Sequence, residues 1–135
     1  MLKKNNQKIY FIAEAGINHN GKLSLAKKLV LAAKQAGAQA VKFQSFKTEE
    51  FLSTKKQTYT YGPKKKTINM YKMFKKVEFK KSWYLKIDKL CKKHKIDFLT
   101  SVADIDSAKD YLRTKKKIIK IASEDIINYP LLNFL

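Results

Sequence analysis

The sequence predicts an α/β protein built on four parallel β-strands with helices between them. Four short runs are rich in β-branched and aromatic residues and are apolar on both faces: residues 8–14, 38–46, 96–101 and 117–123. Runs of this kind are typical of parallel strands that are buried from both sides. Lysine-rich helical patterns separate the runs, and repeated strand–helix units indicate a parallel sheet with right-handed crossovers.

Helical periodicity predicts helices over residues 23–36, 82–94 and 104–113, and a further helix that begins in "YPLLNFL" at 129–135. In the first of these, apolar residues recur at helical spacing, lysines take the other face, and Gly37 provides a C-terminal stop. A short helix is also expected before residue 82. The connection over 47–66 exceeds usual lengths, so we expect either a lid over a site or a mobile basic loop.

The composition favours a single globular domain in a reduced compartment. The chain has 135 residues and one cysteine, Cys91, so no internal disulfide is possible. No apolar run approaches the roughly 18 residues of a membrane span, and the N-terminus does not have the pattern of a signal peptide. We therefore expect a cytoplasmic protein that does not engage a membrane.

The net charge of +19 raises the question of nucleic-acid binding. Of 30 basic residues only Arg113 is arginine, and the lysines are spread along the whole chain. Base-edge recognition favours the arginine fork, so the pattern indicates a lysine-rich composition and no specific nucleic-acid site. A non-enzymatic basic module that binds polyanions remains the alternative function.

Polar side chains follow or interrupt each predicted strand. In parallel β/α structures, sites form at the carboxyl ends of the strands. The residues concerned are Glu14, then Lys42 and Gln44, then Thr100 and Ser101, then Lys120, Ser123, Glu124 and Asp125.

Two of these residues are lysines inside strands, and they suggest the ligand. An unpaired cation costs several kcal/mol to bury, so Lys42 and Lys120 each require an anion nearby. Two such lysines beside acidic residues favour a multiply charged anionic ligand, such as one with a phosphate and a carboxylate. A Schiff-base lysine is the mechanistic alternative. His19 follows the first strand and is expected to line the mouth of the site, but neither histidine has metal-ligand spacing.

Four stretches resemble, in order and spacing, the N-terminal half of the N-acetylneuraminate (sialic acid) synthase family: "AEAGINHNG", "AKKLVLAAKQAGAQAVKFQSF", "FLTSVADIDSA" and "KIASEDIINYPLL". The resemblance covers residues 8–134 and is to the sialic and legionaminic acid branch. It implies that residues 1–135 form the N-terminal half of a TIM (β/α)8 barrel, with no second domain. It also implies condensation of phosphoenolpyruvate with an N-acetylated amino sugar, such as N-acetylmannosamine, to a nonulosonic acid and phosphate.

The resemblance also implies roles for individual residues. Glu14 corresponds to a catalytic carboxylate, Gln44 and Asp125 to sugar-binding residues, and the phosphoenolpyruvate ligands are Lys42, Ser101, Lys120 and Ser123. Several positions depart from the family pattern, among them Asp125, which replaces the more common glutamate. Ser101 replaces a usual threonine, and the proline that normally follows is lost. Glu124 replaces a glycine and places a charge in a tight phosphate-binding turn.

The family uses a divalent metal ion, manganese or magnesium, whose ligands are not expected in this chain. Its members act on small-molecule substrates as homodimers, and no specific nucleic-acid partner is implied. A complete (β/α)8 barrel needs about 200 residues. We therefore expect this chain to be a fragment or the product of a split gene, and to be inactive by itself.

Overall fold

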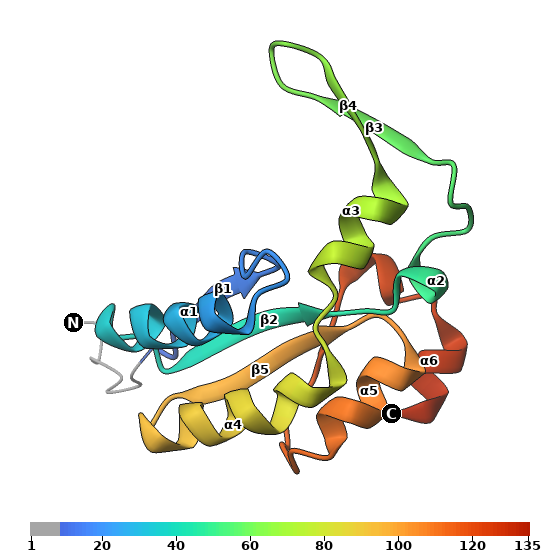
Figure 1. The fold of residues 1–135 in the computed structure, drawn as a ribbon. Helices are drawn as coiled ribbons and strands as arrows, with labels where there is room; N and C mark the ends of the chain where they lie inside the picture. The colour runs from blue at the N-terminus through green and yellow to red at the C-terminus, as the bar shows by residue number, and fades with distance from the viewer. Residues whose placement is uncertain (1–8) are drawn as a thin grey trace, which may run out of the picture.

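The computed structural model describes residues 9–135 and contains one four-stranded parallel sheet (Figure 1). Its strands are β1 (Ile12–Gly16), β2 (Ala40–Ser45), β5 (Asp97–Val102) and β6 (Lys120–Ile121), in the order β1-β2-β5-β6. Every neighbouring pair in this sheet is parallel. The predicted α/β class with four parallel strands is confirmed. Lys8, the start of the first predicted run, lies outside the described residues.

The predicted helices are also present, with slightly different ends. They are α1 (Leu23–Gln35), α4 (Tyr84–Lys93), α5 (Ile105–Leu112) and α6 (Tyr129–Phe134). A 3-10 turn, η1 (Lys81–Trp83), leads directly into α4, and a second, η2 (Ser123–Asp125), follows β6. In the described part of the chain, no helix combines the length and apolar character needed to cross a membrane.

The hydrophobic core lies between one face of the sheet and the helices that follow the strands. Val41, Phe43 and Phe98 project from the sheet into this core and are fully buried. On the helix side, Tyr111 packs edge-on against Phe98, and its hydroxyl donates to the Phe98 carbonyl at 3.1 Å. Alternate residues of the strands therefore form the core, and the remaining ones project from the opposite face.

The first strand is not buried from both sides, contrary to the prediction. Phe11 and Ile12 are 60% and 46% exposed. The reason is topological, because β1 is an edge strand with only β2 beside it. Among residues 9–135 no second layer covers the face of β1 that points away from the helices. An apolar sequence therefore did not mean that both faces of this strand are buried.

The connection after β2 is folded, so the alternative of a mobile basic loop over 47–66 is wrong, while the alternative of a lid stays a prediction. It contains a short helix, α2 (Thr48–Phe51), and an antiparallel hairpin of β3 (Thr58–Tyr61) and β4 (Lys66–Asn69). The hairpin leads into α3 (Met70–Val77), the short helix expected before residue 82, and projects well away from the sheet (Figure 1). The alternation in "TYTY" followed by Gly62, which has a positive φ of 75°, is the signal for this hairpin.

A tight turn after β1 packs against the end of α3. Asn20 and Gly21 both have left-handed backbones, with φ of 49° and 72°. A Cβ on Gly21 would overlap the backbone carbonyl of Lys76 in α3. Gly37, at the end of α1, is also left-handed with φ of 83°, but a Cβ there would have no neighbour within 4 Å.

We predict that Gly21→Ala destabilises the chain clearly more than Gly37→Ala does. Both substitutions incur the left-handed backbone cost of about 1–2 kcal/mol, but only the first must also displace the Lys76 carbonyl. Urea unfolding followed by circular dichroism measures the two losses side by side. Equal losses would show that the contact between this turn and α3 is not tight.

Candidate functional site

The face of the sheet that points away from the helices gathers five of the predicted site residues. In the strand register, Glu14 lies opposite Lys42, Gln44 opposite Ser101, and Ser101 opposite Lys120. Residues opposite one another in parallel strands project from the same face. Since Val41 and Phe43 belong to the core, these five side chains occupy the other face.

Lys42 is the most buried charged group of this face, with a side chain only 15% exposed. Its ammonium group forms an ion pair with the carboxylate of Glu14 and donates a hydrogen bond to Ser101 Oγ at 3.2 Å. The expectation that this strand lysine requires an anion is confirmed. The Glu14 side chain is 50% exposed, so the pair is open to solvent on the glutamate side.

Lys120 behaves differently from Lys42, and the expectation that it is buried beside an acid is wrong. Its side chain is exposed, and its ammonium group donates to the carbonyl of the next residue, Ile121. No carboxylate among residues 9–135 lies within ion-pair distance of it. The physical reason is that β6 has two residues and forms an edge of the sheet, so the long side chain reaches solvent.

The turn after β6 carries the remaining predicted residues. Ser123 is exposed, and its hydroxyl donates to the carboxylate of Glu124 at 3.3 Å. Asp125 is 9% exposed, and its Oδ2 atom is buried without a hydrogen-bond partner among the described residues. Burial raises the pKa of this carboxyl above its ordinary value. A buried acceptor without a donor is costly and is often completed by a ligand or water.

A small cavity of about 60 Å³, here called the site cavity, lies at the carboxyl ends of β2, β5 and β6. The polar side chains of Gln44, Ser101, Glu124 and Asp125 contribute to its lining. Three phenylalanines also line it, and their ring centroids lie 5.0 to 5.4 Å apart: Phe46, Phe51 and Phe74. The sequence did not predict this aromatic wall. Phe51 lies within the connection over 47–66 and Phe74 lies after it, and no site residues were expected there.

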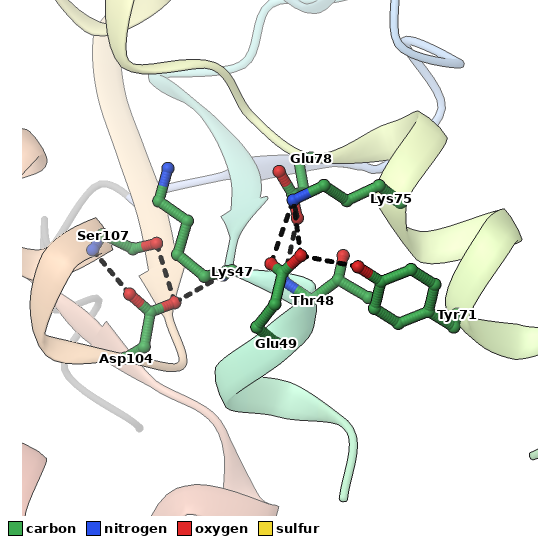
Figure 2. Close-up of polar contacts among 8 residues, drawn as sticks. All are labelled: Lys47, Thr48, Glu49, Tyr71, Lys75, Glu78, Asp104 and Ser107. Carbon is green, nitrogen blue, oxygen red and sulfur yellow. Dashed lines mark hydrogen bonds and ion pairs between the residues drawn. The ribbon is translucent and has the colours of Figure 1, made fainter. Parts of the chain in front are cut away.

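Asp104 follows Ala103 of the site cavity and holds two segments of the chain together (Figure 2). Its Oδ1 atom accepts from the backbone N–H of Ser107 at 2.7 Å and caps α5. Its Oδ2 atom accepts from the Ser107 hydroxyl at 2.8 Å and from the backbone N–H of Lys47 at 2.7 Å. One buried carboxylate therefore joins the start of α5 to the residue that leads from β2 into α2. The preference for aspartate before a helix is the sequence signal for the capping role, though not for the contact with Lys47.

A second polar cluster joins α2 to α3 (Figure 2). The ammonium group of Lys75 contacts the carboxylates of Glu49 at 2.9 Å and Glu78 at 3.1 Å. Glu78 also accepts from the backbone N–H of Thr48 at 2.9 Å, and the Tyr71 hydroxyl donates to Glu49 at 2.6 Å. Hydrogen bonds from Tyr71 and Lys75 lower the pKa of Glu49 to about 2.

His19 does not line the mouth of the site, so that expectation is wrong. Its ring is fully buried against Phe43, Phe79 and Trp83, with centroids 5.3 to 6.1 Å away. Its Nδ1 atom accepts from the backbone N–H of Gly21 at 3.1 Å, and burial lowers its pKa. Within residues 9–135 no three His, Cys, Asp or Glu side chains are grouped to hold a metal ion. The described residues therefore do not by themselves fit a divalent metal site.

We predict that Asp104→Asn destabilises the chain by about 1–3 kcal/mol, because one buried donor is left without its carboxylate acceptor. Asp106→Asn is the matched control, since Asp106 lies in the same first helical turn but is exposed. Its ion pair to Lys109 at 3.6 Å is on the surface and is worth little. Urea unfolding of both variants makes the comparison, and a loss no larger than that of the control would contradict the bridging role.

Comparison with known proteins shows the family of the chain. Residues 29–135 match the NeuB family. The chain is 37% identical over 125 residues to an N,N'-diacetyllegionaminic acid synthase of Legionella pneumophila, covering 91% of this chain and 35% of that protein. It is 35% identical over 134 residues to an N-acetylneuraminate-9-phosphate synthase of Drosophila melanogaster, covering 92% of this chain and 34% of that protein.

The fold matches that of a solved relative. The crystal structure of an N-acetylneuraminic acid (sialic acid) synthetase from Leptospira borgpetersenii in complex with citrate superposes with a TM-score of 0.81 at 32% identity. The match covers 96% of this chain and 41% of that one. This chain thus spans about a third of the length of the curated relatives named above. Because the family match extends over residues 29–135, the chain belongs to the NeuB family.

Proposed function

We propose that this chain provides the phosphoenolpyruvate-binding face, and part of the sugar-binding face, of a nonulosonic acid synthase. The complete enzyme would condense phosphoenolpyruvate with an N-acetylated amino sugar, such as N-acetylmannosamine, and release phosphate. The observation that carries the proposal is that Lys42, Ser101 and Lys120 share one face of three adjacent strands. Two cations and a hydroxyl on one face suit a ligand with both a phosphate and a carboxylate.

The two lysines contribute differently to anion binding in this proposal. Lys120 is exposed and without an ion pair among the described residues, so it can bind an anion at little cost. Lys42 is already paired with Glu14, so a ligand anion must share or replace that partner. Glu14, released in part from Lys42, is then the carboxylate placed to hold or accept a proton beside the reacting groups.

Gln44 and Asp125 are the proposed sugar-side residues. Both line the site cavity, and the unpartnered Oδ2 of Asp125 is a ready acceptor for a ligand hydroxyl or amide. A divalent metal ion, manganese or magnesium, also belongs to the proposal. Its ligands are proposed to lie outside the described residues. Assembly as a homodimer in the cytoplasm completes the proposal.

We predict that Lys42→Ala and Lys120→Ala each weaken phosphoenolpyruvate binding by about tenfold, which corresponds to about 1.4 kcal/mol for one lost charge-assisted contact. Isothermal titration of the 135-residue chain at constant ionic strength measures the effect. Lys86→Ala, which removes an exposed lysine of α4, is the control and should leave binding unchanged. Equal weakening by all three variants would favour the non-enzymatic polyanion-binding module instead.

We also predict that Glu124→Gly strengthens phosphoenolpyruvate binding. The Glu124 carboxylate accepts the Ser123 hydroxyl and places a negative charge beside the proposed phosphate position. Glu124→Gln keeps the size of the side chain and removes only the charge, so it separates repulsion from steric obstruction. Titration should show tighter binding for both variants if charge dominates. An unchanged affinity in both would show that Ser123 is not near the bound phosphate.

A further inference from the structure

The β3–β4 hairpin and α3, together called the arm, carry an apolar groove that the proposed reaction does not use. This arm groove is a cavity of about 360 Å³ lined by six side chains of β3, β4 and α3: Tyr59, Tyr61, Ile68, Met70, Met73 and Phe74. It lies on the part of the chain that projects from the body (Figure 1). A continuous apolar surface exposed on a projecting element is typical of an interaction site.

The hairpin presents its two faces very differently. Tyr59 and Tyr61 are two residues apart on β3, and their rings are nearly parallel, with an interplanar angle of 8° and centroids 6.1 Å apart. They are 57% and 43% exposed. On the opposite face, the hydroxyls of Thr60 and Thr67 bond to each other at 2.8 Å. Both faces are exposed, but only the aromatic face lines the groove, so the threonine face supplies a control position.

The charge around the groove identifies the kind of partner. Residues 51–77 contain eight lysines and no acidic residue. Lys55 and Lys56 precede β3, and Lys64, Lys65 and Lys66 form the hairpin tip and the start of β4. A second copy of the arm would bring the same charge against itself, which disfavours pairing. A partner needs apolar side chains for the groove and carboxylates for its lysine rim.

The base of the arm is held firmly enough to present the groove in one orientation. Lys75 and Tyr71 of α3 are bound to Glu49 of α2, and Glu78 is bound to the start of α2. The methionines of the groove are adaptable and suit side chains of varied shape. Since Phe74 lines both the arm groove and the site cavity, an occupant of the groove would contact one wall of the proposed site.

We propose that the arm groove is a docking surface for an acidic amphipathic segment of another protein, which inserts apolar side chains between the tyrosines and α3. This inference does not rest on the proposed reaction. Half of the lining consists of the aliphatic side chains of Ile68, Met70 and Met73, which offer no flat face for stacking a base and therefore favour apolar protein side chains.

The test uses a fluorescein-labelled synthetic helix with leucines on one face and glutamates on the other. The control peptide has the same glutamates, with serine in place of each leucine. Fluorescence anisotropy with the 135-residue chain should show at least about tenfold tighter binding of the leucine peptide. The double variant Tyr59→Ser/Tyr61→Ser should lose that advantage, whereas Thr67→Ser, on the other face, should retain it. Met73→Gln tests the groove from α3 and does not depend on hairpin folding.

Three outcomes would overturn the proposal. Equal binding of the leucine and serine peptides would show that the interaction depends on charge alone. The same conclusion would follow if neither the tyrosine variant nor Met73→Gln changed the affinity for the leucine peptide. Tighter binding of a single-stranded oligothymidine, weakened by the same tyrosine variants, would indicate a nucleic-acid platform. Sedimentation equilibrium that shows a dimer abolished by those variants would assign the groove to a second copy. Phosphoenolpyruvate binding, measured in parallel, should be unaffected by Tyr59→Ser and reports separately on the proposed function.

Discussion

The largely buried ammonium group of Lys42 is the constraint on which the arrangement of the sheet depends. Its partners come from the strands on either side, Glu14 from β1 and Ser101 from β5. A cation in such a position is tolerated only when its partners are in place, because desolvation otherwise outweighs the benefit. A register slip of one residue would turn Lys42 toward the positions of Val41 and Phe43 in the core. One ion pair thus helps to fix both the neighbours of β2 and its register.

This dependence explains why much of the sheet could be predicted from the sequence. The two-residue spacing of Lys42 and Gln44 identifies one face of β2, and the apolar residues between them identify the other. Parallel register then brings Glu14 and Ser101 to the same face. The positions of Lys120 and His19 could not be predicted in this way. They depend on the shortness of β6 and on aromatic side chains distant in sequence, such as Phe79 and Trp83.

The hairpin was not predicted, for a related reason. Its strands are short and β3 is exposed throughout, so the alternation in "TYTY" is not accompanied by a run of core residues. What orders the segment is a set of polar contacts around Glu49, Lys75 and Glu78, which join positions up to 30 residues apart. Asp104 similarly joins α5 to Lys47 across 57 residues. Contacts between residues so far apart in the sequence form only when the fold brings them together. The sequence itself therefore indicates only the local role of Asp104 as the cap of α5.

The same ion pair that orders the sheet also shapes how the site can bind an anion. Lys42 is neutralised by Glu14 in the structure, whereas Lys120 has no carboxylate partner among the described residues. In the proposed function, an incoming anion meets Lys120 first and competes with Glu14 for Lys42. An anion that shares Lys42 with Glu14 divides the attraction of that ammonium group between two negative charges. The structural role of Lys42 and its proposed role in anion binding are therefore two consequences of one ion pair.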